Sequence, residues 1–250
     1  MNCEKLASLL PDTVPQIHYF RELPSTNLVA KEYAERGEKE GIFIAEKQTA
    51  GKGRLGRSFF SPPASGLYIS FLLRPTVSAE DIYLLTTTAA VAVCETAELF
   101  SGREASIKWV NDVLVADKKV CGILTEGSFD DNKLSYAVIG IGVNLFPPKD
   151  GFPEEIEDKA GTVFTARKDC LEEFTADLIV RFLRLLNEDC YDRYVMRSII
   201  RGRTIGLVSG GEKKDAVVLG LDEKCRLLVR YSDGKQELID CGEVSVEGLY

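Results

Sequence analysis

The segment AGKGRLGRSFFSPPASG, residues 50–66, restricts the fold of this chain more than any other part of the sequence. Its first three glycines have the G-x-G-x-x-G spacing of dinucleotide-binding loops, which must follow a strand and begin a helix. The run GIFIAEKQ (41–48) predicts the preceding strand, but LYISFLL (67–73) predicts another strand where the helix should start. A Rossmann unit is therefore excluded. A P-loop is excluded too, because no Gly-Lys-Ser or Gly-Lys-Thr stands at the required offset.

The same loop carries three cations within six residues: Lys52, Arg54 and Arg57. Glycines between them allow backbone N–H groups to approach an anion. This composition predicts a loop that clamps a phosphate-bearing ligand. Taken alone, the loop is equally compatible with a solvated charged turn.

Whole-chain properties limit the partners and the compartment. The length of 250 residues suffices for one large domain with a small companion, and the net charge of −8 argues against a protein whose main task is to bind nucleic acid. No apolar run approaches the roughly 20 residues of a membrane helix, and no secretory leader is visible. The seven cysteines are scattered and form no C-x-x-C. We therefore expect a cytoplasmic protein without nucleic-acid or membrane partners.

The pattern of elements predicts an α+β fold. Helices are expected over three ranges: 25–36, 82–100 and 170–195. Ser25 or Thr26 would cap the first helix, and the pair Ser78 and Asp81 would cap the second. His18 has no partner pattern of a catalytic triad and is expected to be a bystander.

Short strands alternate with turns in the second half of the chain. Successive hairpin strands are expected at SIKWV (106–110), VLVAD (113–117), KVCGILTEGS (119–128) and KLSYAVIGIGVNL (133–145). A turn at Asp117-Lys118 would join the second and third of these strands. After a boundary near residues 200–204, strands separated by SGG, LDEK and SDGK predict a small separate β-barrel.

Five motifs occur in order along the chain: STN (25–27), KQTAGKGRLGRSFFSP (47–62), KWVND (108–112), KVCGIL (119–124) and GIGVNL (140–145). In this order they resemble the motifs of biotin protein ligases. The resemblance implies a class II synthetase-like catalytic domain with a mixed sheet over residues 1–200, followed by an SH3-like β-barrel domain over 201–250. Because STN begins so early, it also implies the form without an N-terminal DNA-binding domain. Lys52, Phe59 and Val110 depart from the family's usual arginine, tryptophan and proline.

The resemblance assigns biotin binding to eleven residues: Ser25, Thr26, Asn27, Gln48, Gly51, Lys52, Gly53, Arg54, Lys119, Gly122 and Leu124. The STN side chains and Gln48 would read the ureido ring of biotin by hydrogen bonds, while the glycine loop folds over the ligand. For Ser25 and Thr26 the plain alternative is helix capping, and for Gln48 it is a surface amide. Lys52 keeps the charge of the usual arginine but loses its bidentate fork.

The resemblance also implies ATP and Mg²⁺ as co-substrate and ion. It places ATP at seven residues: Arg54, Arg57, Phe59, Asn111, Asp112, Lys119 and Asn144. Phe59 would stack on adenine, and the metal ligands stay open. Lys119, Arg54 and Asp112 are the catalytic candidates, although Lys119 could also be an ordinary exposed hairpin lysine. Trp109 is expected to serve core packing.

The implied activity is that of an AMP-forming biotin–[acetyl-CoA carboxylase] ligase. Such an enzyme activates biotin as biotinyl-5'-AMP and transfers it to a specific lysine of a biotin carboxyl carrier domain. Because the carboxylate of biotin is already ionised, the first step needs positioning and charge neutralisation rather than a general base. The sequence leaves a homodimer open. The alternative functions are a lipoate ligase-like enzyme and a non-catalytic sensor of biotin or its adenylate.

Overall fold

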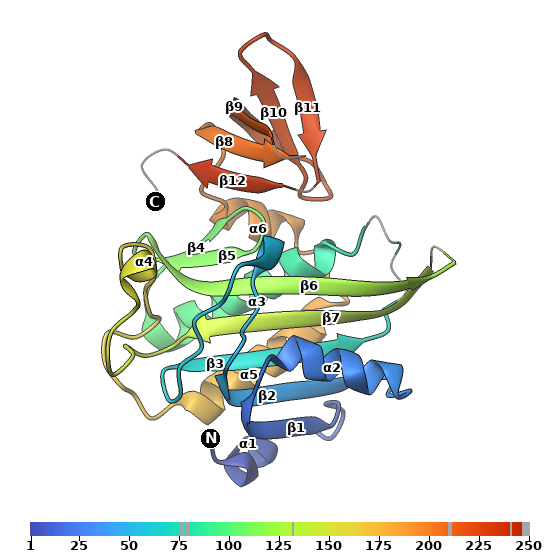
Figure 1. Ribbon diagram of the computed structural model, residues 1–250, viewed down its shortest axis with the longest axis vertical. Helices are drawn as coiled ribbons and strands as arrows, with labels where there is room; N and C mark the ends of the chain where they lie inside the picture. Colours follow the sequence, from blue (N-terminus) through green and yellow to red (C-terminus); the bar gives the residue numbers. More distant parts are fainter. Residues whose placement is uncertain (76–77, 79–80, 132, 210–211, 241, 247–250) are drawn as a thin grey trace.

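The computed structural model describes residues 1–75, 78, 81–131, 133–209, 212–240 and 242–246. They form a seven-stranded mixed sheet with helices on both faces, followed by a five-stranded antiparallel sheet at one end of the molecule (Figure 1). This arrangement is the expected α+β fold.

The large sheet has the strand order β1-β2-β3-β7-β6-β5-β4. Its strands are β1 (Ile17–Leu23), β2 (Gly41–Gln48), β3 (Gly66–Leu73), β4 (Ala105–Lys108), β5 (Asp112–Val115), β6 (Lys118–Asp130) and β7 (Lys133–Asn144). β1 and β2 pair in parallel because helix α2 (Thr26–Glu35) carries the chain back between them, and every other neighbouring pair is antiparallel. The glycine loop thus joins two antiparallel strands, as predicted, and no Rossmann unit forms there.

Both faces of the large sheet are buried, which explains the continuous apolar runs of its central strands. In β2, Ile42 and Ile44 face the main core with α3 (Leu84–Ser101) and α5 (Leu171–Leu185), whereas Phe43 packs under α2 on the other face. Figure 1 shows α2 on one face and α3 and α5 on the opposite one. The length and composition of α3 would also suit a membrane span, but 67% of this helix is buried inside the protein, as expected of a core helix.

The prediction of one helix over 170–195 is wrong in one respect. This range contains two helices, α5 and the start of α6 (Tyr191–Arg197). Between them the Asp189 carboxylate accepts a hydrogen bond from the Tyr191 N–H (2.9 Å), a local turn that competes with helical hydrogen bonds. Two further α-helices in the described part of the chain are short: α1 (Cys3–Leu9) and α4 (Glu154–Glu157).

The predicted cap of α3 is also wrong. The helix begins at Leu84, three residues after Asp81, and its N-cap has no side-chain hydrogen bond. The Ser78 hydroxyl instead donates to the carboxylate of Asp81 at 2.8 Å. The pairing was correctly expected, but it stabilises the turn before the helix.

The hairpin between β5 and β6 turns one residue earlier than predicted. Ala116 and Asp117 occupy its two central positions with φ of 49° and 59°, so that Lys118 belongs to β6 and pairs with Val115. Positive φ at both positions gives a twist that matches the flanking strands. The predicted strand SIKWV is shorter than expected and ends at Lys108.

The second sheet has the strand order β11-β10-β9-β8-β12 and is compatible with the expected SH3-like barrel. Its strands are β8 (Thr204–Ser209), β9 (Glu212–Leu221), β10 (Leu227–Tyr231), β11 (Gln236–Ile239) and β12 (Glu243–Val246). The predicted turns LDEK and SDGK separate strands as expected, while Gly210 and Gly211 of SGG lie outside the described residues. The sheet is tied to the rest of the chain by Trp109, whose Nε1–H donates to the Cys225 carbonyl (2.9 Å).

Candidate active site

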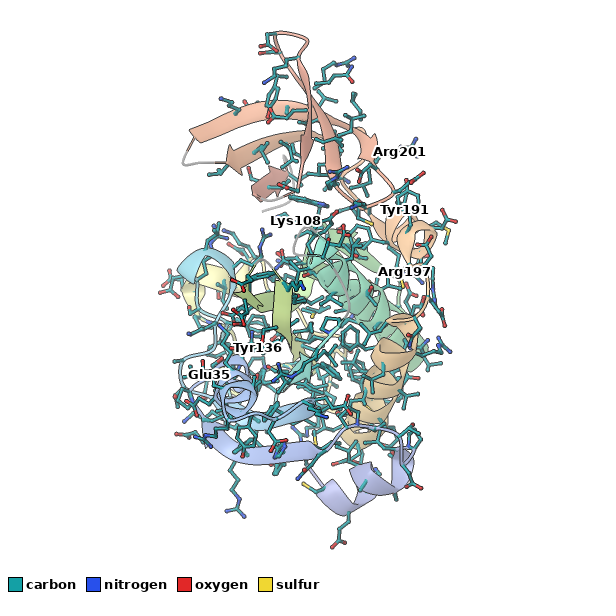
Figure 2. The ribbon with its side chains drawn as sticks, turned by 90° about the vertical axis from the view of Figure 1, so that its right-hand side faces the viewer. Glu35, Lys108, Tyr136, Tyr191, Arg197 and Arg201 are labelled. Atoms are coloured by element: carbon teal, nitrogen blue, oxygen red, sulfur yellow. The ribbon has the colours of Figure 1, made fainter. Side chains whose placement is uncertain are left out.

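A cavity of about 540 Å³ lies on the face of the large sheet that carries α2. Its walls come from the N-terminus of α2, the glycine loop, β6, β7, the turn at 108–112, the segment 152–160 and β12. This volume suits a cofactor-sized or drug-sized ligand. Figure 2 shows the upper end of this region, where Lys108 lies at the junction of the two sheets.

Every predicted site residue except Gly51 lines this cavity. Gly51 lies just behind the wall, where an added Cβ would come within 2.5 Å of the Phe59 carbonyl oxygen and 2.7 Å of Ser61 Oγ. Glycine at this position therefore allows the two arms of the loop to approach each other. The fold brings the predicted residues together, and their contacts with a ligand stay a prediction.

One end of the cavity, here called the polar end, is lined by the neutral polar side chains of Ser25, Thr26, Asn27 and Gln48, with Ser70 buried behind them. The Gln48 Oε1 accepts hydrogen bonds from the Thr26 N–H (2.8 Å) and the Thr26 hydroxyl (3.2 Å). Ser70 Oγ lies 2.6 Å from both Thr26 Oγ1 and Asn27 Oδ1. Thr26, Asn27, Gln48 and Ser70 therefore belong to one hydrogen-bond network, which does not include the Ser25 side chain. Such a network presents fixed donors and acceptors to a ligand.

Ser25 occupies the N-cap position of α2, but its side chain makes no capping hydrogen bond. The first N–H of the helix is satisfied by Gln48 instead. Ser25 is buried and lines the cavity. The capping alternative thus has no support for this hydroxyl, which is available to a ligand.

Behind the polar end lies Glu126 on β6. Its carboxylate accepts a hydrogen bond from Asn27 Nδ2 (2.8 Å) and forms an ion pair with Lys31. Burial opposes ionisation of Glu126, but the hydrogen bonds from Lys31 and Asn27 outweigh it and hold the pKa of this carboxyl below its usual value. Glu126 is therefore an anionic acceptor at neutral pH.

The glycine loop closes on itself as an irregular hairpin. The Gly53 N–H donates to the Arg57 carbonyl (2.7 Å), and the Phe59 N–H donates to the Gly51 carbonyl (2.8 Å). At the tip, Leu55 has φ 54° in the left-handed region. These contacts argue against a purely solvated turn, because both arms of the loop are held over the cavity.

The ring of Phe59 lies on the floor of the cavity, on a pair of glycines. Gly122 of β6 and Gly142 of β7 face each other in register, and an added Cβ would come within 3.2 Å and 2.5 Å of the ring respectively. Side chains at these two positions would collide with Phe59. The glycines thus make room for an aromatic ring between the two ends of the cavity.

The opposite end of the cavity, here called the cationic end, contains Arg54, Asn111, Asp112 and Lys119. Lys119 Nζ lies 2.7 Å from Asp112 Oδ1, and the two side chains are 31% and 17% exposed. Arg54 donates to Asn111 Oδ1 (3.2 Å) and to the Gly242 carbonyl of the second sheet (3.0 Å). Along β6 the polar and cationic ends are separated by about five residues, roughly 16 Å. A ligand with a neutral ring at one end and a phosphate at the other fits this order.

Several lining residues were not among the predicted site residues. They include Lys108, Gly140, Phe152, Glu155, Ile156, Lys159, Val244 and Ser245. Lys108 and Gly140 belong to the motifs KWVND and GIGVNL, so the motifs could have indicated them. In the structure Lys108 is 8% exposed and pairs in register with Asp112. The segment 152–160 carries no motif. It reaches the site because the Lys119 N–H donates to the Lys159 carbonyl (2.7 Å).

The donor set at the cationic end bears on the implied Mg²⁺. Among the described residues no group of three or more His, Cys, Asp and Glu side chains is placed to hold a metal. Asp112, with the amide oxygens of Asn111 and Asn144, offers the hard oxygen ligands that Mg²⁺ accepts. This set fits an ion that arrives with nucleotide phosphates, since Mg²⁺ commonly uses one or two carboxylates plus substrate oxygens.

Comparison with known protein families identifies the class of enzyme to which this fold and two-ended cavity belong. The chain belongs to the biotin/lipoate A/B protein ligase family, whose model matches residues 19–144. Residues 201–246 match a more particular description, the biotin protein ligase C terminal domain.

Individual relatives agree with this family. The chain is 30% identical over 238 residues to the bifunctional ligase/repressor BirA of Bacillus subtilis, covering 88% of this chain and 71% of that protein. It is 30% identical over 241 residues to the biotin–[acetyl-CoA-carboxylase] ligase of Paracoccus denitrificans, covering 90% and 98%. Among solved structures, the biotin protein ligase of Aquifex aeolicus in complex with biotin and ATP superposes with a TM-score of 0.76 at 27% identity, covering 92% and 98%.

Proposed function

We propose that this protein is a biotin protein ligase, which uses ATP to form biotinyl-5'-AMP and then transfers biotin to a lysine of a carrier domain. One observation carries the proposal: a single cavity joins a neutral hydrogen-bonding end to a cationic end beneath a glycine loop. The family and the relatives named as biotin ligases support the same activity and do not favour the lipoate or sensor alternatives.

In the first step the carboxylate of biotin attacks the α-phosphorus of ATP and pyrophosphate leaves. The ureido ring would lie at the polar end against Ser25, Thr26 and Gln48, which directs the carboxylate toward the cationic end. Arg54 and Lys119 would stabilise the negative charge that develops on the phosphoryl oxygens. Mg²⁺ bound to ATP would neutralise further charge, with Asp112 as its carboxylate ligand or neighbour.

In the second step the acceptor lysine attacks the carbonyl of the mixed anhydride and AMP leaves. The attacking amine must lose a proton, and Asp112 is a carboxylate at this end of the cavity that could accept it. Its neighbour Lys119, 2.7 Å away, would keep the AMP phosphate in place. The glycine loop would restrict water, which otherwise hydrolyses the anhydride.

Contacts at the cavity support a division of the chain into two domains. We infer a catalytic domain over residues 1–200 and a C-terminal domain over 201–250. Val244 and Ser245 of the second sheet line the cavity, and the Gly242 carbonyl holds Arg54. The C-terminal domain would therefore complete the nucleotide end. The expectation that nucleic acid is not a partner stays a prediction from the acidic charge balance. The cytoplasmic location also stays a prediction.

The direct test is covalent transfer. Purified protein is incubated with ATP, Mg²⁺, labelled biotin and the isolated carrier domain of a biotin-dependent carboxylase. We expect ATP-dependent label on the carrier and none on a carrier whose acceptor lysine is replaced by arginine. Transfer of lipoate in preference to biotin would support the lipoate ligase instead. Binding of biotin without release of pyrophosphate or AMP would support the sensor.

A further inference from the structure

The hydrogen atoms at the polar end can be assigned by counting donors and acceptors. Asn27 Nδ2 has two hydrogens, and both have acceptors: Glu126 Oε2 at 2.8 Å and the Leu124 carbonyl at 3.3 Å. The amide is therefore oriented with its oxygen toward Ser70. Because that oxygen can only accept, the single Ser70 hydrogen is donated to Asn27 Oδ1 at 2.6 Å.

This orientation determines what Thr26 can offer a ligand. Ser70 Oγ is 2.6 Å from Thr26 Oγ1, and Gln48 Oε1 is 3.2 Å from it. Since the Ser70 hydrogen is committed to Asn27, the Thr26 hydrogen is donated to Ser70 or to Gln48, and in both cases a side chain of the network accepts it. Thr26 therefore presents only lone pairs to the cavity.

We infer that Glu126 and Ser70 are positioning residues that set the hydrogen-bond polarity of the polar end, so that Thr26 accepts an N–H from the ligand ring. The inference rests on the proposed function, and it states which part of the biotin ureido group the site selects. A ring with an ether oxygen at that position would place two acceptors against each other. Sites that pair with a ligand N–H reject analogues that lack it, because a buried polar group is then left unpaired.

Glu126 is suited to this role because donors approach it from both sides. Lys31 pairs with one carboxylate oxygen, and Asn27 donates to the other. A glutamine at this position has only one oxygen. The charged Lys31 would take that oxygen, which turns the new NH₂ group toward Asn27 and forces the Asn27 amide to flip. The flipped amide would then donate to Ser70, Ser70 would donate to Thr26, and the acceptor presented to the ligand would lose its fixed orientation.

The test compares three variants by biotin-dependent ATP–pyrophosphate exchange. Glu126→Gln should raise the KM for biotin by about 10-fold or more, the loss expected when a buried hydrogen-bond pair is mismatched. The KM for ATP should change by less than about two-fold, since the nucleotide end is untouched. Adding Lys31→Met to Glu126→Gln should restore the KM for biotin, because the glutamine can then turn its oxygen to Asn27.

Glu22→Gln is the matched control, because Glu22 also pairs with a lysine, Lys47 at 2.9 Å, but lies on β1 outside the cavity. It should leave both KM values unchanged. A second readout uses the two cyclic carbamate analogues of biotin, each with one ureido N–H replaced by oxygen. The wild-type protein should discriminate against at least one analogue, and Glu126→Gln should discriminate less.

An unchanged KM for biotin in a folded Glu126→Gln protein would overturn the inference, and so would a double variant that recovers nothing. If Glu126→Gln does not fold, Ser70→Ala interrupts the same chain and should reduce the discrimination between biotin and the carbamates. Full discrimination in Ser70→Ala would also overturn the inference. A wild-type protein without biotin-dependent exchange would instead refute the proposed function, so the two failures are distinguishable.

Discussion

Replacing Gly140 by alanine should disrupt the polar end of the cavity without removing any polar group. A Cβ at this position would come within 2.0 Å of Asn27 Oδ1 and 2.8 Å of its Cγ. The amide is the end of a side chain, but it is not free to move, because Ser70 and Glu126 hold it and Asn27 is only 4% exposed. Relief of the collision must therefore break hydrogen bonds.

The size of the effect follows from these contacts. Ordinary van der Waals contact requires at least 3.4 Å, so Asn27 Oδ1 must move by about 1.4 Å, which is too far for the 2.6 Å bond to Ser70 and the 2.8 Å bond to Glu126 to persist. The neutral bond is worth about 1 kcal/mol and the charged one about 2 kcal/mol, while alanine in a strand regains about 0.5–1 kcal/mol over glycine. The free energy of unfolding should fall by about 2 kcal/mol. For a chain of this size, Tm should fall by roughly 4–8 °C.

Thermal unfolding and biotin titration together test this reasoning. Gly220→Ala is the matched control: Gly220 also lies in a strand, β9, but an added Cβ would meet no heavy atom within 4 Å. Its Tm should stay the same or rise slightly, since alanine restricts the unfolded chain. Equal Tm values for the two variants, with unchanged biotin affinity in Gly140→Ala, would refute the account of the polar end.

Three further predictions concern other parts of the site. Lys119→Met keeps the alkyl chain but removes the charge, and should slow adenylate formation by roughly 10²–10³-fold in pyrophosphate exchange; undiminished exchange would contradict its role. Trp109→Phe loses the buried bond to the Cys225 carbonyl, and urea unfolding should show a loss of about 1–2 kcal/mol. A difference near zero would mean that this link between the sheets is not stabilising. Because the pKa of Glu126 is lowered, its stabilisation is present above the ordinary glutamate value of about 4.3 and lost as pH falls through the lowered value. Urea unfolding at decreasing pH should show the stability difference between wild type and Glu126→Gln shrinking below about pH 4, and a constant difference would argue against an ionised Glu126.

Local sequence patterns predicted helices and strands well where the adjacent residues and the burial in the fold favour the same element. The strand expected over 41–48 forms with the same bounds, because its apolar run is buried on both faces of the sheet. The helix expected over 25–36 ends as predicted before Gly37, which has φ 100°. The glycine loop was correctly separated from the Rossmann type, which requires a helix that the sequence excludes, and from the P-loop, which requires a Gly-Lys-Ser or Gly-Lys-Thr that the loop lacks.

Two of the errors arose where a side chain forms a hydrogen bond in a local turn instead of supporting the predicted helix. Asp189 accepts the Tyr191 N–H and interrupts the helix predicted over 170–195. Ser78 bonds the side chain of Asp81 in a turn rather than capping α3. Periodicity does not distinguish these outcomes, since a polar residue that suits a helix cap also suits a turn.

The candidate site likewise contains residues that the sequence predicted and residues that only the fold brings together. Motif order placed the ligand-facing residues in one family pattern, and every one of them except Gly51 lines the cavity. Ser70 and Glu126, by contrast, lie outside the five motifs. Their importance depends on atoms that only folding brings within 3 Å of Asn27. The direction of a hydrogen bond follows from all partners of a group together, and no single stretch of sequence contains them.

The sequence of this protein therefore specified its strands, its glycine loop and the chemical types available for binding, because these depend on neighbours within a few residues. It did not specify how segment 152–160 and β12 complete the cavity, because their contacts join residues more than 30 positions apart. Nor did it specify which atom of Thr26 faces the ligand. That choice depends on a buried network, where each donor and acceptor must be satisfied at once and the cost of leaving one unpaired determines the arrangement.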